Sequence, residues 1–262
     1  MKAAVVVANE DVQYQEIEEP QAKPGWVKIK VKASGICGSD VPRVLNHGVH
    51  FYPIVLGHEF SGDVVEVGEG VTKVKVGDRV SGAPLLPCMK CDDCQNGNFS
   101  LCKHYSFIGS RQQGSNADYV VIPEQNAIPF DPSISYEQGA MFEPSTVALH
   151  GLLQNDYQGG RCVAILGCGT IGIFTMQWAK IFGSKKVVVF DISEELSIQP
   201  KRIIWKRLWQ LPVVRAMNMC LKQPDRFPLC IWHLNLLRIR HTYASLEHLM
   251  QILRLHQSSG RI

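Results

Sequence analysis

The last quarter of the sequence contains almost no glycine and almost no acidic residues. Only Gly260 of the 22 glycines and only two of the 24 acidic residues lie between positions 197 and 262, whereas 11 of the 27 lysines and arginines lie there. Residues 1–196 therefore carry a net charge of −6, and residues 197–262 carry one of +9. This break in composition indicates that the two regions must be interpreted separately.

The sequence also lacks two kinds of hydrophobic segment. It has no uninterrupted apolar run of about 18 residues, so no membrane-spanning helix is predicted. The apolar residues near the N-terminus are not followed by the small-residue pattern of a secretory signal. We therefore expect a cytoplasmic protein with no membrane partner. In a reducing cytosol, the nine cysteines indicate metal binding rather than disulfides.

Four of the cysteines lie close together in the segment CMKCDDCQNGNFSLC. Spacers of two, two and seven residues separate Cys88, Cys91, Cys94 and Cys102. Two-residue spacers let a tight turn direct successive sulfur atoms to one point, and four thiolates complete a tetrahedral zinc site that supports folding rather than catalysis. An iron–sulfur cluster is the alternative, although the ferredoxin pattern has a shorter last spacer followed by proline.

A second set of candidate ligands is spread along the first 150 residues. Cys37 lies in SGICGSD, after the alternating strand pattern of residues 27–32. His58 and Glu59 lie in GHEFSGDVVEVGEGV, and Glu143 lies in the otherwise apolar FEPSTVALH. An unpaired carboxylate in an apolar segment is costly, so we expect Glu143 to face a cation. A thiolate, an imidazole and a carboxylate leave one position of a zinc ion open, which is the pattern of a catalytic site.

These motifs resemble the zinc-containing medium-chain alcohol and polyol dehydrogenases. The resemblance is carried by CGSD, GHEFSGDVVEVGEGV, the four-cysteine segment, FEP and GCGTIG, and it extends from residue 1 to about residue 196. The glutamate of FEP is typical of the polyol branch, and LPCMKCDDCQNGNFSLCKHYSFIGSR is similar to the galactitol-1-phosphate and sorbitol dehydrogenases. The resemblance implies a zinc-dependent, NAD-linked enzyme that oxidises a polyol or polyol phosphate.

The resemblance also implies a set of metal ligands. Cys37, His58 and Glu143 would hold the catalytic zinc ion, and Glu59 would be an alternate or outer ligand that exchanges with water. Together with the structural site of the four cysteines, this implies two zinc ions per chain.

Two residues near Cys37 receive catalytic roles from the same resemblance. Ser39 would hydrogen-bond the substrate hydroxyl and pass on its proton, and Asp40 would orient the zinc-bound imidazole. Zinc would stabilise the substrate as an alkoxide, whose carbon donates hydride to the nicotinamide ring.

The chain departs from the resembling sequences in two places. Pro42 stands where ethanol-type members have a relay histidine, so the proton must leave through Ser39 and water. The relatives tend to read GGFAEY after GSR, whereas residues 114–119 of this chain read GSNADY, in a loop that helps to shape the substrate cleft. Arg111, just before this loop, is a candidate contact for a substrate phosphate, and a solvated surface arginine is the alternative.

The segment RCVAILGCGTIGIFTMQWAKIFGSKKVVVFD predicts the first strand–helix–strand unit of a dinucleotide-binding domain. Gly167 permits the tight turn, Gly169 lets a pyrophosphate approach the backbone, and Gly172 lets the helix pack closely on the strand. The first helical residues, Thr170 and Ile171, supply free N–H groups and a partial positive charge for the phosphates.

An acidic residue ends the second strand of this unit. Asp191 lies 19 residues after Gly172. A carboxylate at this position accepts hydrogen bonds from the adenosine ribose hydroxyls and repels a 2′-phosphate. The sequence therefore predicts NAD rather than NADP as the cofactor.

The pattern of a complete dinucleotide-binding domain is not recognisable past Asp191. A complete domain has two such halves, but residues 197–262 contain four prolines and no buried strand pattern bounded by turns. Three explanations compete: a shift of reading frame near codon 196, a basic segment that binds nucleic acid or an anionic membrane, and a divergent but folded completion of the domain. The abrupt loss of glycine and of periodicity favours the frame shift and argues against a nucleic-acid partner.

We therefore expect an α/β fold with a β-rich part. A GroES-like, zinc-binding catalytic domain is predicted for residues 1–150, an incomplete Rossmann domain for residues 151–196, and an unpatterned basic tail for residues 197–262. The expected partner is a small-molecule polyol or polyol phosphate. The relatives commonly form homo-oligomers through the cofactor domain, including parts not recognisable here, so no assembly is predicted. A zinc-binding fragment without catalysis and a basic nucleic-acid-binding protein are the alternative functions.

The chain of 262 residues is predicted to be inactive, because the nicotinamide half of the cofactor domain is not recognisable in it. The purified chain, incubated with NAD and galactitol 1-phosphate, sorbitol or butanediol, should form no more NADH than a control without substrate. Detectable turnover would contradict this prediction. Translation of the gene in the other two frames past codon 196 complements the assay, because a second strand–helix–strand half in another frame would support the frame-shift explanation.

Overall fold

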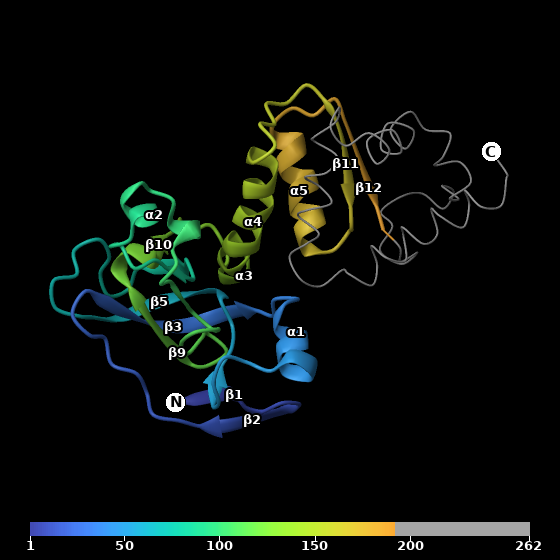
Figure 1. The fold of residues 1–262 in the computed structure, drawn as a ribbon. Helices are drawn as coiled ribbons and strands as arrows, with labels where there is room; N and C mark the ends of the chain where they lie inside the picture. The colour runs from blue at the N-terminus through green and yellow to red at the C-terminus, as the bar shows by residue number, and fades with distance from the viewer. Residues whose placement is uncertain (192–262) are drawn as a thin grey trace. The chain divides into compact units, whose positions relative to one another are not determined.

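The computed structural model describes residues 1–191, which form two compact units (Figure 1). The first unit spans Met1–Pro144, and the described part of the second begins at Ser145. The unpatterned tail predicted for residues 197–262 lies outside the described residues.

The first unit is built on a five-stranded antiparallel sheet. Its strand order is β10-β6-β5-β3-β9, so β3 lies between β5 and β9. The strands are β3 (Trp26–Gly35), β5 (Glu59–Val67), β6 (Arg79–Gly82), β9 (Tyr119–Pro123) and β10 (Ala127–Pro129). The β-rich character predicted for this part of the chain is confirmed.

Two smaller sheets and several short helices complete the first unit. One sheet has the order β2-β1-β4, and the other pairs β7 with β8. Their strands are β1 (Lys2–Ala8), β2 (Asp11–Glu16), β4 (Ile54–Val55), β7 (Leu85–Leu86) and β8 (Ser106–Phe107). The helical turns are α1 (Asp40–Pro42), η1 (Arg43–His47), α2 (Asp92–Gln95), η2 (Phe99–Leu101), η3 (Glu124–Asn126) and α3 (Tyr136–Ala140).

The main core of the first unit follows from alternation along the strands. Val27 and Ile29 of β3 and Val120 and Ile122 of β9 are buried at every second position, so they share one face of the sheet. Phe60 of β5 belongs to the same cluster and is fully buried. Its burial contributes roughly 1.5–3 kcal/mol to folding. The alternating pattern that predicted a strand at residues 27–32 therefore corresponds to a central strand of the sheet.

The second unit contains a strand–helix–strand arrangement. β11 (Cys162–Leu166) and β12 (Lys186–Phe190) are parallel and in register, and α5 (Thr170–Ile181) connects them. Figure 1 shows α5 beside both strands, with α4 (Phe142–Leu153) beside α5. The Trp178 indole N–H of α5 donates to the Ser145 carbonyl of α4 at 3.0 Å, which fixes the two helices to one another.

Among residues 1–191, no helix combines the length and the apolar character needed to cross a bilayer.

Candidate active site and metal centres

The register of β3 against β5 brings the predicted ligands to one end of the sheet. Gly35, the last residue of β3, pairs with Glu59, the first residue of β5. Cys37 follows β3 by two residues, and His58 immediately precedes β5. Antiparallel strands place the end of one beside the start of the next, so the thiol and the imidazole meet although 20 residues of sequence separate them.

Cys37, His58 and Glu59 form one group of potential metal ligands. One ligand atom from each of these residues lies within 4.8 Å of the others. His58 and Glu59 are buried, with 5% and 7% of their surface exposed, and Cys37 is half-buried. Among the described residues, this is one of two clusters that have the donor types and spacing of a metal site.

Glu143 lies close to this group without belonging to it. It is in the first turn of α4, and its ligand oxygens are not among the atoms that lie within 4.8 Å of one another. Burial, together with the smaller effect of the negative charges of Glu59 and Asp40, raises the pKa of Glu143 to about 7. Glu59 therefore completes the compact group in this structure, and Glu143 is near enough for the Glu59 charge to raise its pKa.

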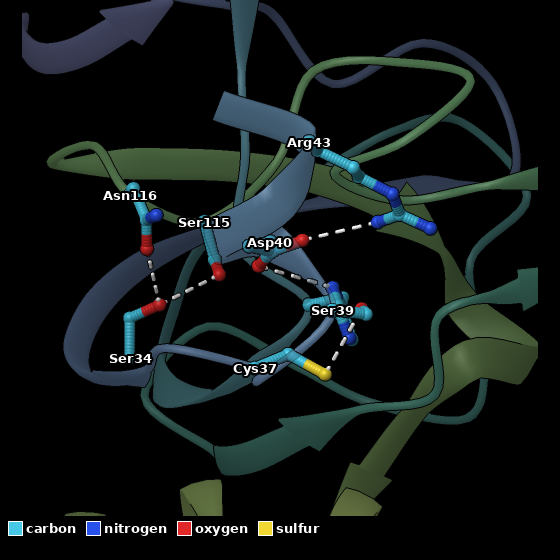
Figure 2. Close-up of polar contacts among 8 residues, drawn as sticks. Ser34, Cys37, Ser39, Asp40, Arg43, Ser115 and Asn116 are labelled. Atoms are coloured by element: carbon cyan, nitrogen blue, oxygen red, sulfur yellow. Dashed lines mark hydrogen bonds and ion pairs between the residues drawn. The ribbon is translucent and has the colours of Figure 1, made fainter. Parts of the chain in front are cut away.

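Ser39 and Asp40 lie near Cys37, as Figure 2 shows. The Ser39 hydroxyl is 3.2 Å from the Cys37 sulfur. The Asp40 carboxylate, which is 3% exposed, has its Oδ2 atom 3.8 Å from His58 Nδ1. This distance is too long for a hydrogen bond. Asp40 nevertheless faces Nδ1 of the ring, which leaves Nε2 as the imidazole nitrogen available to a metal.

The side chains of Cys37, His58 and Glu59 are suited to bind a divalent cation. Burial raises the pKa of the Cys37 thiol and of the Glu59 carboxyl, and neighbouring carboxylates raise both further. The pKa of His58 is lowered, chiefly by burial, so the imidazole is held in the neutral form that binds metals. A buried zinc ion would reverse the unfavourable burial of the acidic groups. Zinc therefore suits Cys37, His58 and a carboxylate from Glu59 or Glu143.

The four-cysteine segment folds into a compact cluster. The sulfur of Cys91 is 3.5 Å from that of Cys94 and 3.9 Å from that of Cys102, and the sulfurs of Cys88 and Cys94 are 3.9 Å apart. Zinc–sulfur bonds of about 2.3 Å in a tetrahedron separate the sulfurs by roughly 3.8 Å. The geometry therefore fits a tetrahedral zinc ion with no open position.

The thiols of this cluster have unequal acidities. Backbone N–H groups of Lys90 and Cys91 lower the pKa of Cys88 to about 6, whereas burial raises the pKa of Cys94 to about 12. Four thiolates at these distances would repel one another, so a cation is needed to hold them together. Short helix α2 carries Cys94, and the turn η2 precedes Cys102, so local backbone alone brings the sulfurs together.

The glycine motif adopts the geometry that the sequence predicts. Gly167 follows β11 with φ at +101°, a conformation that favours glycine. A Cβ atom on Gly172 would collide with the Gly167 carbonyl, so glycine is required where α5 crosses the turn. Gly169 caps the helix, and Thr170 and Ile171 begin it. Free N–H groups at this helix end suit a pyrophosphate.

Asp191 lies directly beside the glycine turn. Its Oδ2 atom accepts a hydrogen bond of 2.6 Å from the Cys168 N–H, and the Gly167 N–H donates to the Phe190 carbonyl at 2.7 Å. Pairing of β11 with β12 thus brings the acidic residue to the edge of the turn. Gly167, Gly169, Gly172 and Asp191 are close neighbours, as a ribose-binding acid next to a phosphate-binding turn requires.

The structure adds residues that sequence reasoning did not assign. Arg43 Nη1 donates to Asp40 Oδ1 at 3.0 Å, three residues apart on a helical turn (Figure 2). An acid and an arginine at that spacing could have indicated the pair. A hydrogen-bonded cluster of Ser34, Ser115 and Asn116 lies behind the ligand segments. No spacing rule predicts it, because Ser34 is 81 and 82 residues from its two partners.

Comparison with known proteins gives consistent relatives. The family described as alcohol dehydrogenase GroES-like domain matches residues 23–132. Galactitol 1-phosphate 5-dehydrogenase of Escherichia coli (strain K12) is 42% identical over 196 residues, which cover 74% of this chain and 57% of the relative.

Two solved structures are similar to this chain. One is a zinc-binding dehydrogenase from Sinorhizobium meliloti 1021 bound to NADP, with 33% identity, a TM-score of 0.72, and coverage of 74% of this chain and 57% of that chain. The other is a short chain alcohol dehydrogenase from Escherichia coli CFT073 complexed with NADH, with 32% identity, a TM-score of 0.71, and coverage of 75% and 58%. This chain therefore spans somewhat more than half the length of the relatives that it matches.

Two separate metal centres predict a simple pattern of metal loss. The purified chain should contain about two zinc ions, and Cys37→Ser and Cys94→Ser should each reduce the content to about one, because each removes a thiolate from a different cluster. Elemental analysis after gel filtration measures the ratio. If the unmodified chain held a single zinc ion that only Cys94→Ser removed, the metal site at Cys37 and His58 would be contradicted.

The raised pKa of Glu143 predicts how metal affinity depends on pH. A carboxyl with a pKa of about 7 holds its proton at pH 6 and must release it when a cation binds nearby. This proton should lower affinity by about tenfold per pH unit below pH 7. Glu143→Gln has no such proton, so its affinity should fall less steeply between pH 7 and 5.5. Cobalt titrations at several pH values compare the slopes, and equal slopes would contradict a role for Glu143.

Proposed function

We propose that this chain belongs, over about three quarters of its length, to the zinc-dependent alcohol and polyol dehydrogenase family, and that it carries the active site of an enzyme that oxidises a polyol or polyol phosphate with NAD. The observation that supports this most is the convergence of Cys37, His58 and Glu59 beside Ser39. A thiol, an imidazole and a carboxylate around one point form a metal site that accepts a further ligand. A site with four protein ligands of one kind would not do so.

The reaction divides between zinc and NAD, which the residues of this chain would hold, and those residues themselves. Zinc, when bound, supplies a Lewis acid that favours ionisation of the substrate hydroxyl, and NAD accepts a hydride. Ser39 holds its hydroxyl 3.2 Å from the Cys37 sulfur, so it lies where it can accept a proton from a substrate hydroxyl beside the metal ligands. The proton then passes to water.

Asp40 and Arg43 keep the histidine ligand in place. The Arg43 guanidinium binds one oxygen of Asp40, and the other oxygen faces His58 Nδ1. A carboxylate beside the distal nitrogen of a ligating histidine orients the ring and increases its basicity. Because Asp40 is 3% exposed, its charge needs the arginine as a partner.

The second unit supports NAD as the cofactor. The turn at Gly167 and the start of α5 suit a pyrophosphate, and Asp191 beside that turn disfavours a 2′-phosphate by repulsion. One similar structure holds NADP and the other holds NADH, so the choice rests on Asp191. The proposed site needs a reducing compartment such as the cytoplasm, since all seven cysteines among residues 1–191 are free.

A basic cluster near the ligand group supports a phosphorylated substrate. Burial lowers the pKa of His50, and the positive charges of Arg111 and Arg43 lower it further, so both arginines lie within electrostatic range of this histidine. Arg43 in turn contacts Asp40 next to the metal ligands. The exposed Arg111 guanidinium stacks on the Tyr105 ring, 4.5 Å from its centre. Arginine in this position suits a phosphate at the far end of a polyol.

Substrate binding can be tested without turnover, because an open metal position makes the absorption of bound cobalt sensitive to added alcohols. In the cobalt-substituted chain, galactitol 1-phosphate should change the cobalt spectrum at a concentration about five to ten times lower than galactitol does. Arg111→Ala should remove this difference, whereas the matched control Arg161→Ala, at an exposed arginine of the second unit, should preserve it.

The outcomes separate the parts of the proposal. A cobalt spectrum that no polyol changes would contradict the proposed function. A spectrum that both compounds change at the same concentration would contradict only the phosphate contact. Inactivity of the chain of 262 residues stays a prediction, and it concerns residues outside the described range.

A further inference from the structure

A polar cluster of Ser34, Ser115 and Asn116 contacts the segments that carry the proposed metal ligands. The Ser34 hydroxyl is 2.9 Å from the Ser115 hydroxyl and donates to Asn116 Oδ1 at 2.9 Å, as Figure 2 shows. A hydroxyl has one proton to donate. Because that of Ser34 goes to Asn116, the Ser115 hydroxyl donates to Ser34. The three side chains therefore form a directed chain from Ser115 through Ser34 to Asn116.

The cluster joins the two segments that carry the metal ligands. Ser34 is on β3, three residues before Cys37. Ser115 and Asn116 are hydrogen-bonded to the segment before His58. The Ser115 N–H donates to the Gly57 carbonyl at 3.0 Å, and the Asn116 N–H donates to the Leu56 carbonyl at 2.9 Å.

Gly57 shows how closely this segment is held. Its φ is +98°, a conformation that favours glycine. A Cβ atom at this position would lie 2.7 Å from the Ser115 hydroxyl and 2.8 Å from the Asn116 side-chain carbon. The two side chains thus pack against the backbone of the residue immediately before His58. These contacts restrict the positions that the backbone next to His58 can take.

Burial makes the cluster costly to break. Ser115 is 1% exposed, and Ser34 and Asn116 are half-buried. A buried hydroxyl that loses its partner carries an uncompensated desolvation penalty. The cluster therefore favours one relative position of its two segments over others. Two of its three members, Ser115 and Asn116, lie in residues 114–119, where the chain reads GSNADY and departs from the sequences it resembles.

We infer that Ser34, Ser115 and Asn116 are positioning residues for the catalytic metal: their hydrogen bonds fix the segment of Cys37 to the segment of His58 before the metal binds. None of the three is a ligand, and none needs to touch the substrate. Their effect is to hold a thiol and an imidazole from two distant parts of the sequence at the separation that one ion requires. This inference rests on the proposed function, since it needs the metal site to exist.

The test measures the affinity of each metal centre in the full chain. Cobalt bound to four thiolates and cobalt bound to one thiolate absorb differently, so competition with a chelator gives a separate dissociation constant for each site. Ser34→Ala should weaken the catalytic site by about tenfold or more, because it removes the partner of both Ser115 and Asn116. The four-cysteine site should keep its affinity.

Three further variants distinguish positioning from simple stabilisation. Ser34→Thr keeps a hydroxyl and should retain most of the affinity. Ser34→Ala combined with Ser115→Ala should bind about as weakly as Ser34→Ala alone, since the two hydroxyls act through one bond. Asn126→Ala is the matched control: Asn126 is buried and its amide donates to the Ala83 and Leu85 carbonyls. It should lower the melting temperature and leave the catalytic site unchanged.

Two results would overturn the inference alone. One is an unchanged catalytic-site affinity in Ser34→Ala, and the other is an equal loss at both centres or in Asn126→Ala, which indicates general destabilisation. If the Ser34→Ala chain does not fold, Ser34→Thr decides: a folded Ser34→Thr chain whose catalytic site binds cobalt at least tenfold more weakly than that of the unmodified chain would also contradict the inference. An unmodified chain that binds only one metal ion would instead contradict the proposed function, and with it the inference.

Discussion

The antiparallel register between β3 and β5 determines where the chemistry of the first unit is located. Gly35 at the end of β3 faces Glu59 at the start of β5, so the residues just beyond one strand and just before the other share a single end of the sheet. This register is what brings Cys37 and His58 together. A shift of one residue in that register would turn Glu59 to the opposite face. The buried cluster around Ile29 and Phe60 opposes such a shift.

The same end of the sheet collects buried negative groups. Glu59 and Asp40 are buried, and Glu143 is close by. Besides burial, the charge of Asp40 raises the pKa of Glu59, and the charges of Glu59 and Asp40 raise the pKa of Glu143. Folding alone does not make such a collection favourable, because ionised carboxylates lose hydration when they are buried and repel one another. A divalent cation would resolve both effects. Without a cation these buried carboxylates destabilise the fold locally, as is expected of a site that binds one.

The two remaining centres are built more locally. The sulfurs of Cys88, Cys91 and Cys94 converge within seven residues of sequence, through a tight turn and the short helix α2. The turn at Gly167 and the start of α5 likewise form within one strand–helix connection. Such sites depend little on distant packing, which is why short motifs predict them. Asp191 needs one further step, the parallel pairing of β11 with β12.

The sequence by itself determined the ligand types, the four-cysteine spacing, the strand at residues 27–32 and the strand–turn–helix of the glycine motif, because each follows from local periodicity or from short spacing. It also identified Cys37, His58, Glu59 and Glu143 as candidates, through resemblance. Only the tertiary structure decided that Glu59 lies within the compact group while Glu143 lies just outside it. Only the fold brought Ser115 to Ser34. Contacts across about 80 residues depend on strand order and register, and these are set by the packing of the whole sheet rather than by any one segment.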